Sequence, residues 1–124
     1  MRCFIGIDLG STTTKAVVID EQQNIIGRGI TNSRSNYDTA AAVAKTEALI
    51  NGRFHLFRGA LQQSGALNGS LESFIGQLER DFRAEQYLEQ LVDLEATCRR
   101  NLAHSNFSGP VAEALDEVFK RDRK

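Results

Sequence analysis

The chain has 124 residues and a net charge of −1, with 41% hydrophobic and 25% charged residues, which is the composition of an ordinary globular domain. The near-neutral charge excludes a protein whose main partner is nucleic acid, because such domains are strongly basic. No apolar run is long enough for a membrane span, and Asp8 interrupts the short apolar N-terminus, so neither a membrane anchor nor a signal peptide is expected. We therefore expect a cytoplasmic protein.

Three short N-terminal segments have the apolar, β-branched content of strands, and they cover residues 3–9, 14–20 and 25–31. The first is expected to be buried on both faces, because it is apolar almost throughout. Gly27 and Gly29 interrupt the third, and they predict a bulge or the close approach of another backbone. The connections are short, so the three strands are expected to form an antiparallel meander.

The chain reads as helix after the strands. Asn36 or Asp38 is suited to cap a helix that reaches about residue 50. Residues 53–64 predict a second helix or an extension of the first, with Gly52 as a possible break.

A long helix is predicted after a linker at residues 65–69, with Ser70 as its cap. Apolar residues recur along it at helical spacing: Leu71, Phe74, Ile75, Leu78, Phe82, Leu88, Leu91, Leu94, Cys98 and Leu102. Such a stripe indicates core or a docking face for another subunit. A break at residues 104–106 and Pro110 then predict a final helix over residues 110–121.

These elements predict the α/β fold class, with α+β organisation in the chain as given. A β-meander at residues 1–37 is expected to precede an incomplete helical segment at residues 38–124 with three to four helices. Cys3 and Cys98 are far apart and have no metal-ligand spacing, so two buried, reduced thiols are expected.

Chemistry is indicated by the run from Asp8 to Lys15, which lies between the first two predicted strands. It supplies a carboxylate, a turn glycine (Gly10), four consecutive hydroxyl residues and a lysine; the hydroxyl residues are Ser11, Thr12, Thr13 and Thr14. A glycine lets the backbone approach a phosphate, and turn N–H groups and hydroxyls bind its oxygens. The lysine adds a point charge, and the carboxylate suits Mg²⁺ held through water.

The run is not a Walker loop, because it lacks the glycine-lysine spacing and is followed by a strand. A plain hairpin with a polar turn is the alternative interpretation. That alternative leaves an aspartate within an apolar strand, and four hydroxyl residues before a lysine, without an explanation.

Residues 4–20 resemble the first phosphate motif of the acetate kinase, sugar kinase, Hsp70 and actin superfamily. The Gly-Ser-Thr-Thr-Thr-Lys run at residues 10–15 is more typical of ATPases that energise electrons for radical enzymes. These are the ATPase subunits of benzoyl-CoA reductase and the activators of 2-hydroxyacyl-CoA dehydratases. Residues 27–38 are more similar to the benzoyl-CoA reductase side.

The resemblance implies the N-terminal part of an actin-like, ribonuclease H-like ATPase lobe. It implies ATP and Mg²⁺ as cofactors, with Asp8 as the catalytic residue and Mg²⁺–water ligand, Gly10 to Thr14 around phosphate, and Lys15 in contact with it. In that family ATP hydrolysis drives a low-potential electron from ferredoxin to subunits that reduce the ring of benzoyl-CoA. A [4Fe-4S] cluster bridges two homologous ATPase subunits there, but neither Cys3 nor Cys98 matches its ligands.

The second lobe of such an ATPase, with its second phosphate loop and adenosine-binding turn, is not recognisable after residue 38. We therefore expect the chain to be part of a longer protein or a truncated product, to bind nucleotide weakly alone, and not to be active alone. A dehydratase activator, a non-catalytic helical module that docks a partner subunit, and a small-molecule kinase of the same superfamily remain alternatives.

Overall fold

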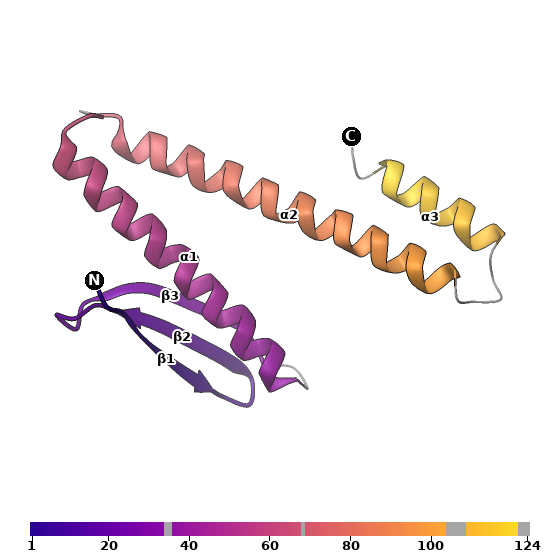
Figure 1. Cartoon of the computed structure of the whole chain (residues 1–124), viewed down its shortest axis with the longest axis horizontal. Coiled ribbons are helices and arrows are strands. Elements are labelled where there is room, and N and C mark those ends of the chain that lie inside the picture. The colour runs from indigo at the N-terminus through magenta and orange to yellow at the C-terminus, as the bar shows by residue number, and fades with distance from the viewer. Residues whose placement is uncertain (34–35, 68, 104–108, 122–124) are drawn as a thin grey trace. The chain divides into compact units, whose positions relative to one another are not determined.

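The computed structural model describes residues 1–33, 36–67, 69–103 and 109–121. Three strands precede three helices along the chain (Figure 1): β1 (Phe4–Leu9), β2 (Thr13–Ile19), β3 (Ile25–Asn32), α1 (Tyr37–Ser64), α2 (Leu71–Ala103) and α3 (Pro110–Arg121). The chain divides into two compact units, Met1–Gly76 and Gln77–Lys124. The first contains the sheet, α1 and the start of α2, and the second contains the rest of α2 with α3.

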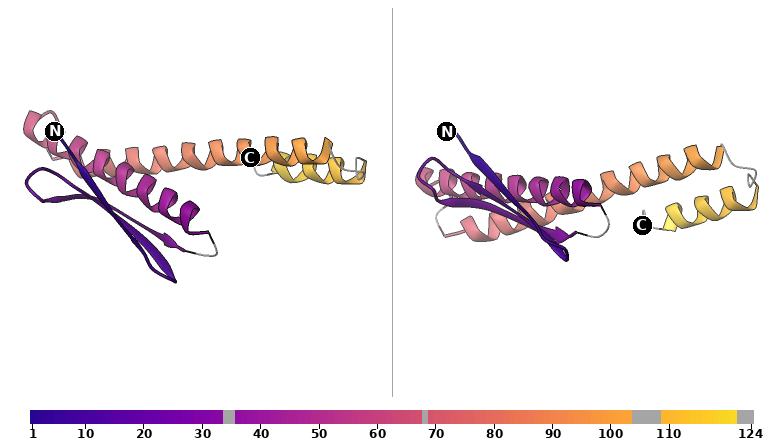
Figure 2. Two further views of the ribbon diagram at one scale, coloured as in Figure 1. Left: turned by 60° about the horizontal axis from the view of Figure 1, so that its bottom comes forward. Right: turned by 90° about the horizontal axis from the view of Figure 1, so that it is seen from below.

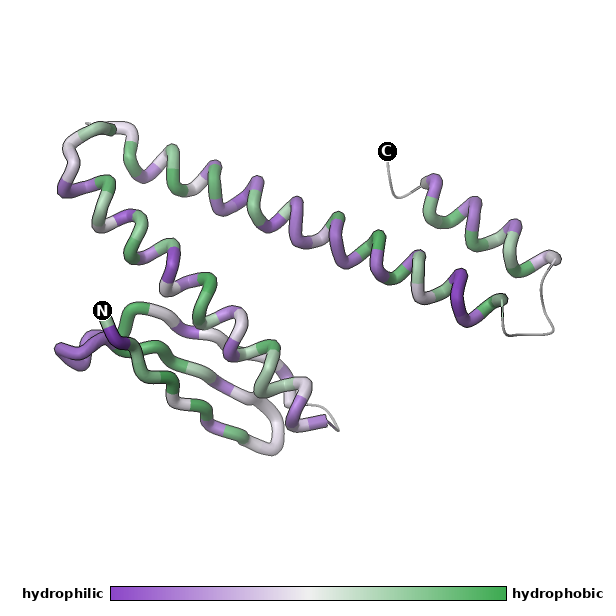
Figure 3. Tube along the Cα trace, viewed as in Figure 1, coloured by the Kyte–Doolittle hydropathy of each residue, from purple (hydrophilic) through white to green (hydrophobic). Residues whose placement is uncertain are grey.

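The three strands form one antiparallel sheet in the order β1-β2-β3, which confirms the predicted meander and fold class. In its register Asp8 lies opposite Lys15, and Ala16 lies opposite Gly29. The β2–β3 ladder shifts register between Val18 and Ile19. The polar β2–β3 turn contrasts with the apolar strands in Figure 3.

Helix α1 covers one face of β2 and β3 (Figures 1 and 2), and the backbone of the helix lies close to that of the strands. A Cβ atom on Gly29 would lie 2.1 Å from the carbonyl oxygen of Ala44, and one on Gly27 would lie 2.1 Å from that of Ala48. Side chains are therefore excluded from both positions. The predicted close approach is confirmed at both glycines, and the register shift lies next to Gly27.

The contact face of α1 consists of small residues one turn apart: Ala40, Ala44, Ala48 and Gly52. Gly52 is buried within the continuous helix and faces Gly27, so the suggestion that it breaks the helix was wrong. The Asn36 side chain accepts a hydrogen bond of 2.9 Å from Thr39 N–H at the helix start. Gly65, with φ at +66°, ends the helix.

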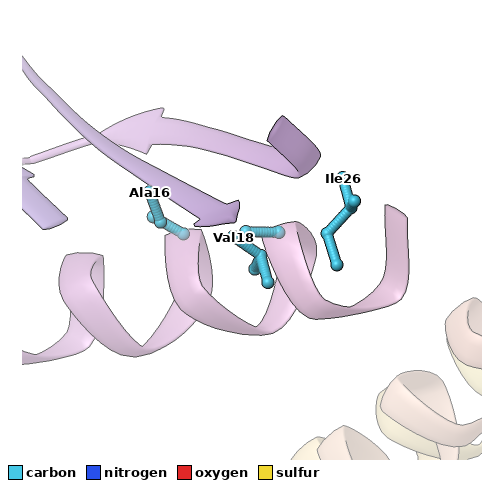
Figure 4. Packing of buried hydrophobic residues seen from close by; sticks show 5 residues of the cluster. Ala16, Val18 and Ile26 are labelled. Carbon is cyan, nitrogen blue, oxygen red and sulfur yellow. The ribbon is translucent and has the colours of Figure 1, made fainter. Parts of the chain in front are cut away.

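The core of the first unit lies between the sheet and α1. Ala16 and Val18 of β2 and Ile26 of β3 point towards the helix (Figure 4), where they pack with Ala44 and Ala48. These side chains are small, so the helix and sheet lie close together and each residue of the contact is sensitive to a change in volume.

Strand β1 was predicted to be buried on both faces, and this prediction was wrong: all six of its residues are exposed, including Phe4 at 58% and Leu9 at 54%. The physical reason is that α1 packs mainly on β2 and β3, while β1 forms an edge of the sheet. Cys3, just before β1, is also exposed and Cys98 is half-buried, which corrects the expectation of two buried thiols.

The β2–β3 turn is organised by Asp20. Its carboxylate accepts hydrogen bonds from the N–H groups of Gln22 (2.9 Å) and Asn24 (2.8 Å) and from the Asn24 side-chain amide (3.0 Å). The Asn24 side chain is the largest contributor to a lowered pKa of Asp20, and the backbone N–H groups of Asn24 and Gln22 and the charge of His55 lower it further, against a smaller rise from burial.

A carboxylate whose pKa is lowered by folding stabilises the fold above its unfolded pKa, and loses that effect as the pH falls through the folded pKa. Asp20→Asn is therefore expected to destabilise the chain at about pH 7 and to have less effect at about pH 3. Thermal unfolding of both proteins followed by circular dichroism measures this difference. A destabilisation of equal size at both pH values contradicts the assignment.

In the second unit, α3 begins at Pro110 as predicted. Arg99 of α2 bonds Glu95 (2.7 Å) and Asp116 of α3 (2.6 Å), and it lowers the pKa of Asp116. The side chains of Arg99 and Asp116 are 47% and 46% exposed, so solvent screens this pair and it contributes little to stability. Phe119 of α3 is buried.

Most of the predicted apolar stripe on α2 is not core among the described residues. Ile75 is its one buried member, and Phe74, Phe82, Leu88 and Leu94 are exposed. The alternative of a docking face therefore stays a prediction for these side chains. None of the described helices has the length and apolar content to cross a membrane.

Candidate functional site

The predicted phosphate-binding run forms the end of β1, the tip of the β1–β2 hairpin and the start of β2. Side chains alternate between the two faces of β2, and Thr14, Ala16 and Val18 face α1. Lys15 therefore lies on the opposite, open face. Asp8 is directly opposite Lys15 in the antiparallel ladder, so the two side chains share that face.

Asp8 and Lys15 are both exposed. The expectation that Asp8 is enclosed in an apolar strand does not hold, because β1 is uncovered on both faces. A solvated carboxylate and ammonium side by side at the end of a sheet can meet a hydrated divalent cation and an anion together. These two groups are of the kind that a magnesium-phosphate ligand contacts.

The hairpin tip is tight and mostly solvent-facing. The N–H of Gly10 donates to the carbonyl of Thr13 at 3.1 Å, and a Cβ atom on Gly10 would lie 2.6 Å from that same oxygen. Gly10 is thus required for the tip geometry. Ser11 and Thr12 are exposed and Thr13 is half-buried, so the hydroxyls of Ser11 and Thr12 are accessible to a ligand.

Thr14 differs from the other hydroxyl residues of the run, because it is fully buried beneath the tip. Its hydroxyl lies 2.9 Å from the hydroxyl of Ser33, which is also fully buried. The hydroxyl of Ser33 donates to the carbonyl of Gly10 at 2.5 Å. The structure therefore brings Asp8, Lys15 and the tip together at the surface and directs the Thr14 hydroxyl inward.

Ser33 is the residue of this site that sequence reasoning missed. It directly follows β3, where the sequence reads only as a polar loop. The signal that could have found it is the meander topology. The end of β3 meets the start of β2, as the pairing of Thr13 with Asn32 shows, so the next residue lies under the hairpin tip.

A groove of about 700 Å³ adjoins the site through Lys15. Its remaining lining comes from β2, β3 and α1: Ala16, Val17, Ile25, Arg28, Gly29, Ile30, Val43, Glu47 and Asn51. The lining is largely apolar, and the Asn51 side chain donates to the carbonyl of Arg28 at 2.7 Å. Lys15 is therefore shared by the groove and the candidate phosphate site, whereas Asp8 and the hairpin tip do not line the groove.

The residues present fit Mg²⁺ and a phosphate but not an iron–sulfur cluster. One exposed carboxylate with nearby hydroxyls suits Mg²⁺, because this ion keeps most of its water when bound. A cluster requires several cysteine thiolates. Across the described part of the chain, no three His, Cys, Asp or Glu side chains are arranged to hold a metal, and Cys3 and Cys98 belong to different units.

A model of the BadF/BadG/BcrA/BcrD ATPase family matches residues 5–123 of the chain, from β1 to beyond α3. The match includes the hairpin, α1, α2 and α3. No curated protein and no solved structure matches the chain.

Proposed function

Because this chain belongs to the BadF/BadG/BcrA/BcrD ATPase family, we propose that its β1–β2 hairpin holds the phosphates of Mg·ATP. The observation that carries the proposal is the geometry of the tip. Asp8 and Lys15 are neighbours on the open face, and a glycine turn with two exposed hydroxyl residues lies beside them. A cation, a carboxylate and close backbone are the groups that this ligand needs.

In the proposed site each group has a separate task. Asp8 accepts hydrogen bonds from water on the magnesium ion, and Lys15 contacts a phosphate oxygen. Gly10 lets the backbone approach, and the hydroxyls of Ser11 and Thr12 donate to phosphate oxygens. Bound Mg²⁺ would supply charge neutralisation of the phosphates during hydrolysis.

We further propose that hydrolysis requires a second lobe or another polypeptide that closes over the hairpin. Two observations support this. The tip residues are open to solvent, whereas efficient phosphoryl transfer needs groups on several sides of the phosphate. Strand β1 also exposes Phe4, Ile7 and Leu9, as expected for an edge strand that further protein covers.

At a finer level, we propose that the ATPase energises electron transfer in a benzoyl-CoA reductase, with ferredoxin as donor and with homologous ATPase and substrate-reducing subunits as cytoplasmic partners. The resemblance at residues 27–38 favours this assignment over an activator of 2-hydroxyacyl-CoA dehydratase. The described residues supply no cluster ligand set, so the [4Fe-4S] group is assigned to none of them.

The second candidate function is a non-catalytic docking module. It is favoured by the exposed apolar side chains of α2 in the second unit, which include Tyr87, Leu88, Val92 and Leu94. This candidate predicts that the hairpin does not respond to nucleotide.

Amide NMR separates the two candidates. Titration of the ¹⁵N-labelled chain with Mg·ATP is expected to shift the N–H signals of Gly10, Ser11, Thr12, Thr13 and Lys15, while the Asp20–Asn24 turn at the other end of the sheet is unaffected. Shifts confined to the groove residues, such as Ile25 and Val43, or no shifts at all from the folded chain, contradict the phosphate site.

A further inference from the structure

We propose that Ser33 is a positioning residue that sets the phosphate hairpin in its binding conformation from beneath. The inference rests on the proposed Mg·ATP site and extends it to a residue outside the phosphate-binding run. Ser33 directly follows β3, and it is fully buried although it is polar. A buried hydroxyl needs partners, and both partners of this one belong to the hairpin.

Ser33 holds the tip by two separate hydrogen bonds. Its backbone N–H donates to the carbonyl of Thr12 at 3.0 Å, and its hydroxyl donates to the carbonyl of Gly10 at 2.5 Å. Two carbonyl groups of the tip are thus turned towards a single residue of the neighbouring strand end.

The consequence for a ligand follows from peptide geometry. In a planar trans peptide the carbonyl and the N–H point in opposite directions. The N–H of Ser11 shares a peptide with the Gly10 carbonyl, and the N–H of Thr13 shares one with the Thr12 carbonyl. Both N–H groups therefore point away from Ser33. The hydrogen bonds therefore hold two carbonyls of the tip, which would repel an anion, towards Ser33. They leave the N–H groups of Ser11 and Thr13 directed away from Ser33, where they can donate to phosphate oxygens.

Thr14 supports Ser33 in this role. A serine hydroxyl has one proton, and in Ser33 this proton is donated to the Gly10 carbonyl. The Thr14 hydroxyl must therefore be the donor in its 2.9 Å contact with Ser33. The two successive hydrogen bonds from Thr14 to Ser33 and from Ser33 to Gly10 fix the orientation of the Ser33 hydroxyl. Hydrogen bonds linked in series in this way strengthen one another.

The test compares Ser33→Ala with the wild-type chain by calorimetric titration with Mg·ADP, at a temperature where both are folded. Ser33→Ala is expected to weaken binding about tenfold, because the Gly10 peptide is no longer held. Thr14→Val removes the support but leaves the Ser33–Gly10 bond in place, so a smaller loss is expected. Ile26→Val is the control for lost stability, because Ile26 is buried in the core near the start of β3, at the opposite end of the strand from Ser33. The affinity of this variant should be unchanged.

A second readout needs no nucleotide. In Ser33→Ala, hydrogen exchange at the Gly10 N–H, which bonds the Thr13 carbonyl, is expected to quicken about tenfold. Exchange at the Asp20 N–H, bonded to the Asn24 carbonyl at the far turn, should stay as in the wild type. A local effect of this kind is not produced by general destabilisation.

The outcomes separate this inference from the proposed function. Wild-type affinity in Ser33→Ala overturns the positioning role, as does exchange at Gly10 that is unchanged or that rises only together with exchange at Asp20. If the folded wild-type chain binds no nucleotide, the proposed function of the isolated chain fails. The exchange measurement then decides by itself whether Ser33 sets the hairpin.

Discussion

Gly29→Ala is expected to separate α1 from the sheet and to lower the stability of the first unit by about 3 kcal/mol or more. The added methyl would lie 2.1 Å from the carbonyl oxygen of Ala44 and 2.7 Å from the backbone nitrogen of Ala48. Both atoms belong to the helix backbone, so no side-chain rotation relieves the overlap. The helix must shift as a whole, which opens the core around Ala16 and Val18.

Thermal unfolding measures this effect, and a loss of this size is expected to lower Tm by at least roughly 12 °C in a unit of this length. Gly59→Ala is the matched control in α1, because a methyl there meets no atom within 4 Å. It is expected to stabilise the helix by about 0.5–1 kcal/mol. A Tm for Gly29→Ala equal to or above that of the wild type contradicts the described packing of α1 on β3.

The sequence was sufficient to predict the meander, because short apolar runs joined by tight polar turns leave only antiparallel neighbours. It also predicted a bulge or a close backbone approach at Gly27 and Gly29, and the close approach is present at both. The start of α3 at Pro110 followed from the preference of proline for the first helical turn.

Other features depend on tertiary contacts and could not be predicted from local pattern. The exposure of β1 is decided by the placement of α1, which packs mainly on β2 and β3, and not by the strand's own hydrophobicity. Gly52 looked like a helix break, but its lack of a side chain serves the contact with Gly27 instead. Its packing partner is 25 positions away in sequence (52 minus 27), and helical periodicity carries no information on such a pair.

In the candidate site, too, some features follow from the sequence and others depend on tertiary contacts. Residue types and spacing were enough to single out Asp8 and Lys15, and the ladder makes these two neighbours. The inward direction of Thr14 follows from which face of β2 receives α1, and this was not predicted. Ser33 belongs to the site only because β3 ends beneath the hairpin tip.

Replacing Asp8 is expected to have the largest effect on nucleotide binding of any single change to a side chain of the run. Asp8→Asn keeps the size of the residue and its exposed position at the end of β1, but it removes the negative charge that attracts hydrated Mg²⁺. Its partner across the ladder, Lys15, stays in place. The change therefore tests the magnesium contact while leaving the rest of the hairpin intact.

Asp20→Asn is the matched control, because it makes the same change of charge at the turn at the opposite end of β2. Its local effect on the turn is separated from binding by titrating at a temperature where both variants are folded. An equal loss of affinity in the two variants would indicate a general charge effect instead of a site at Asp8.

The most direct test of the central claim is calorimetric titration of the wild-type chain and of Asp8→Asn with Mg·ATP. If the hairpin is a phosphate site, the wild type binds Mg·ATP, the affinity falls when Mg²⁺ is chelated, and Asp8→Asn weakens binding by at least about tenfold, or ~1.4 kcal/mol. If the folded wild type shows no binding, or if Asp8→Asn binds Mg·ATP as the wild type does, the assignment of the β1–β2 hairpin as the nucleotide site is contradicted.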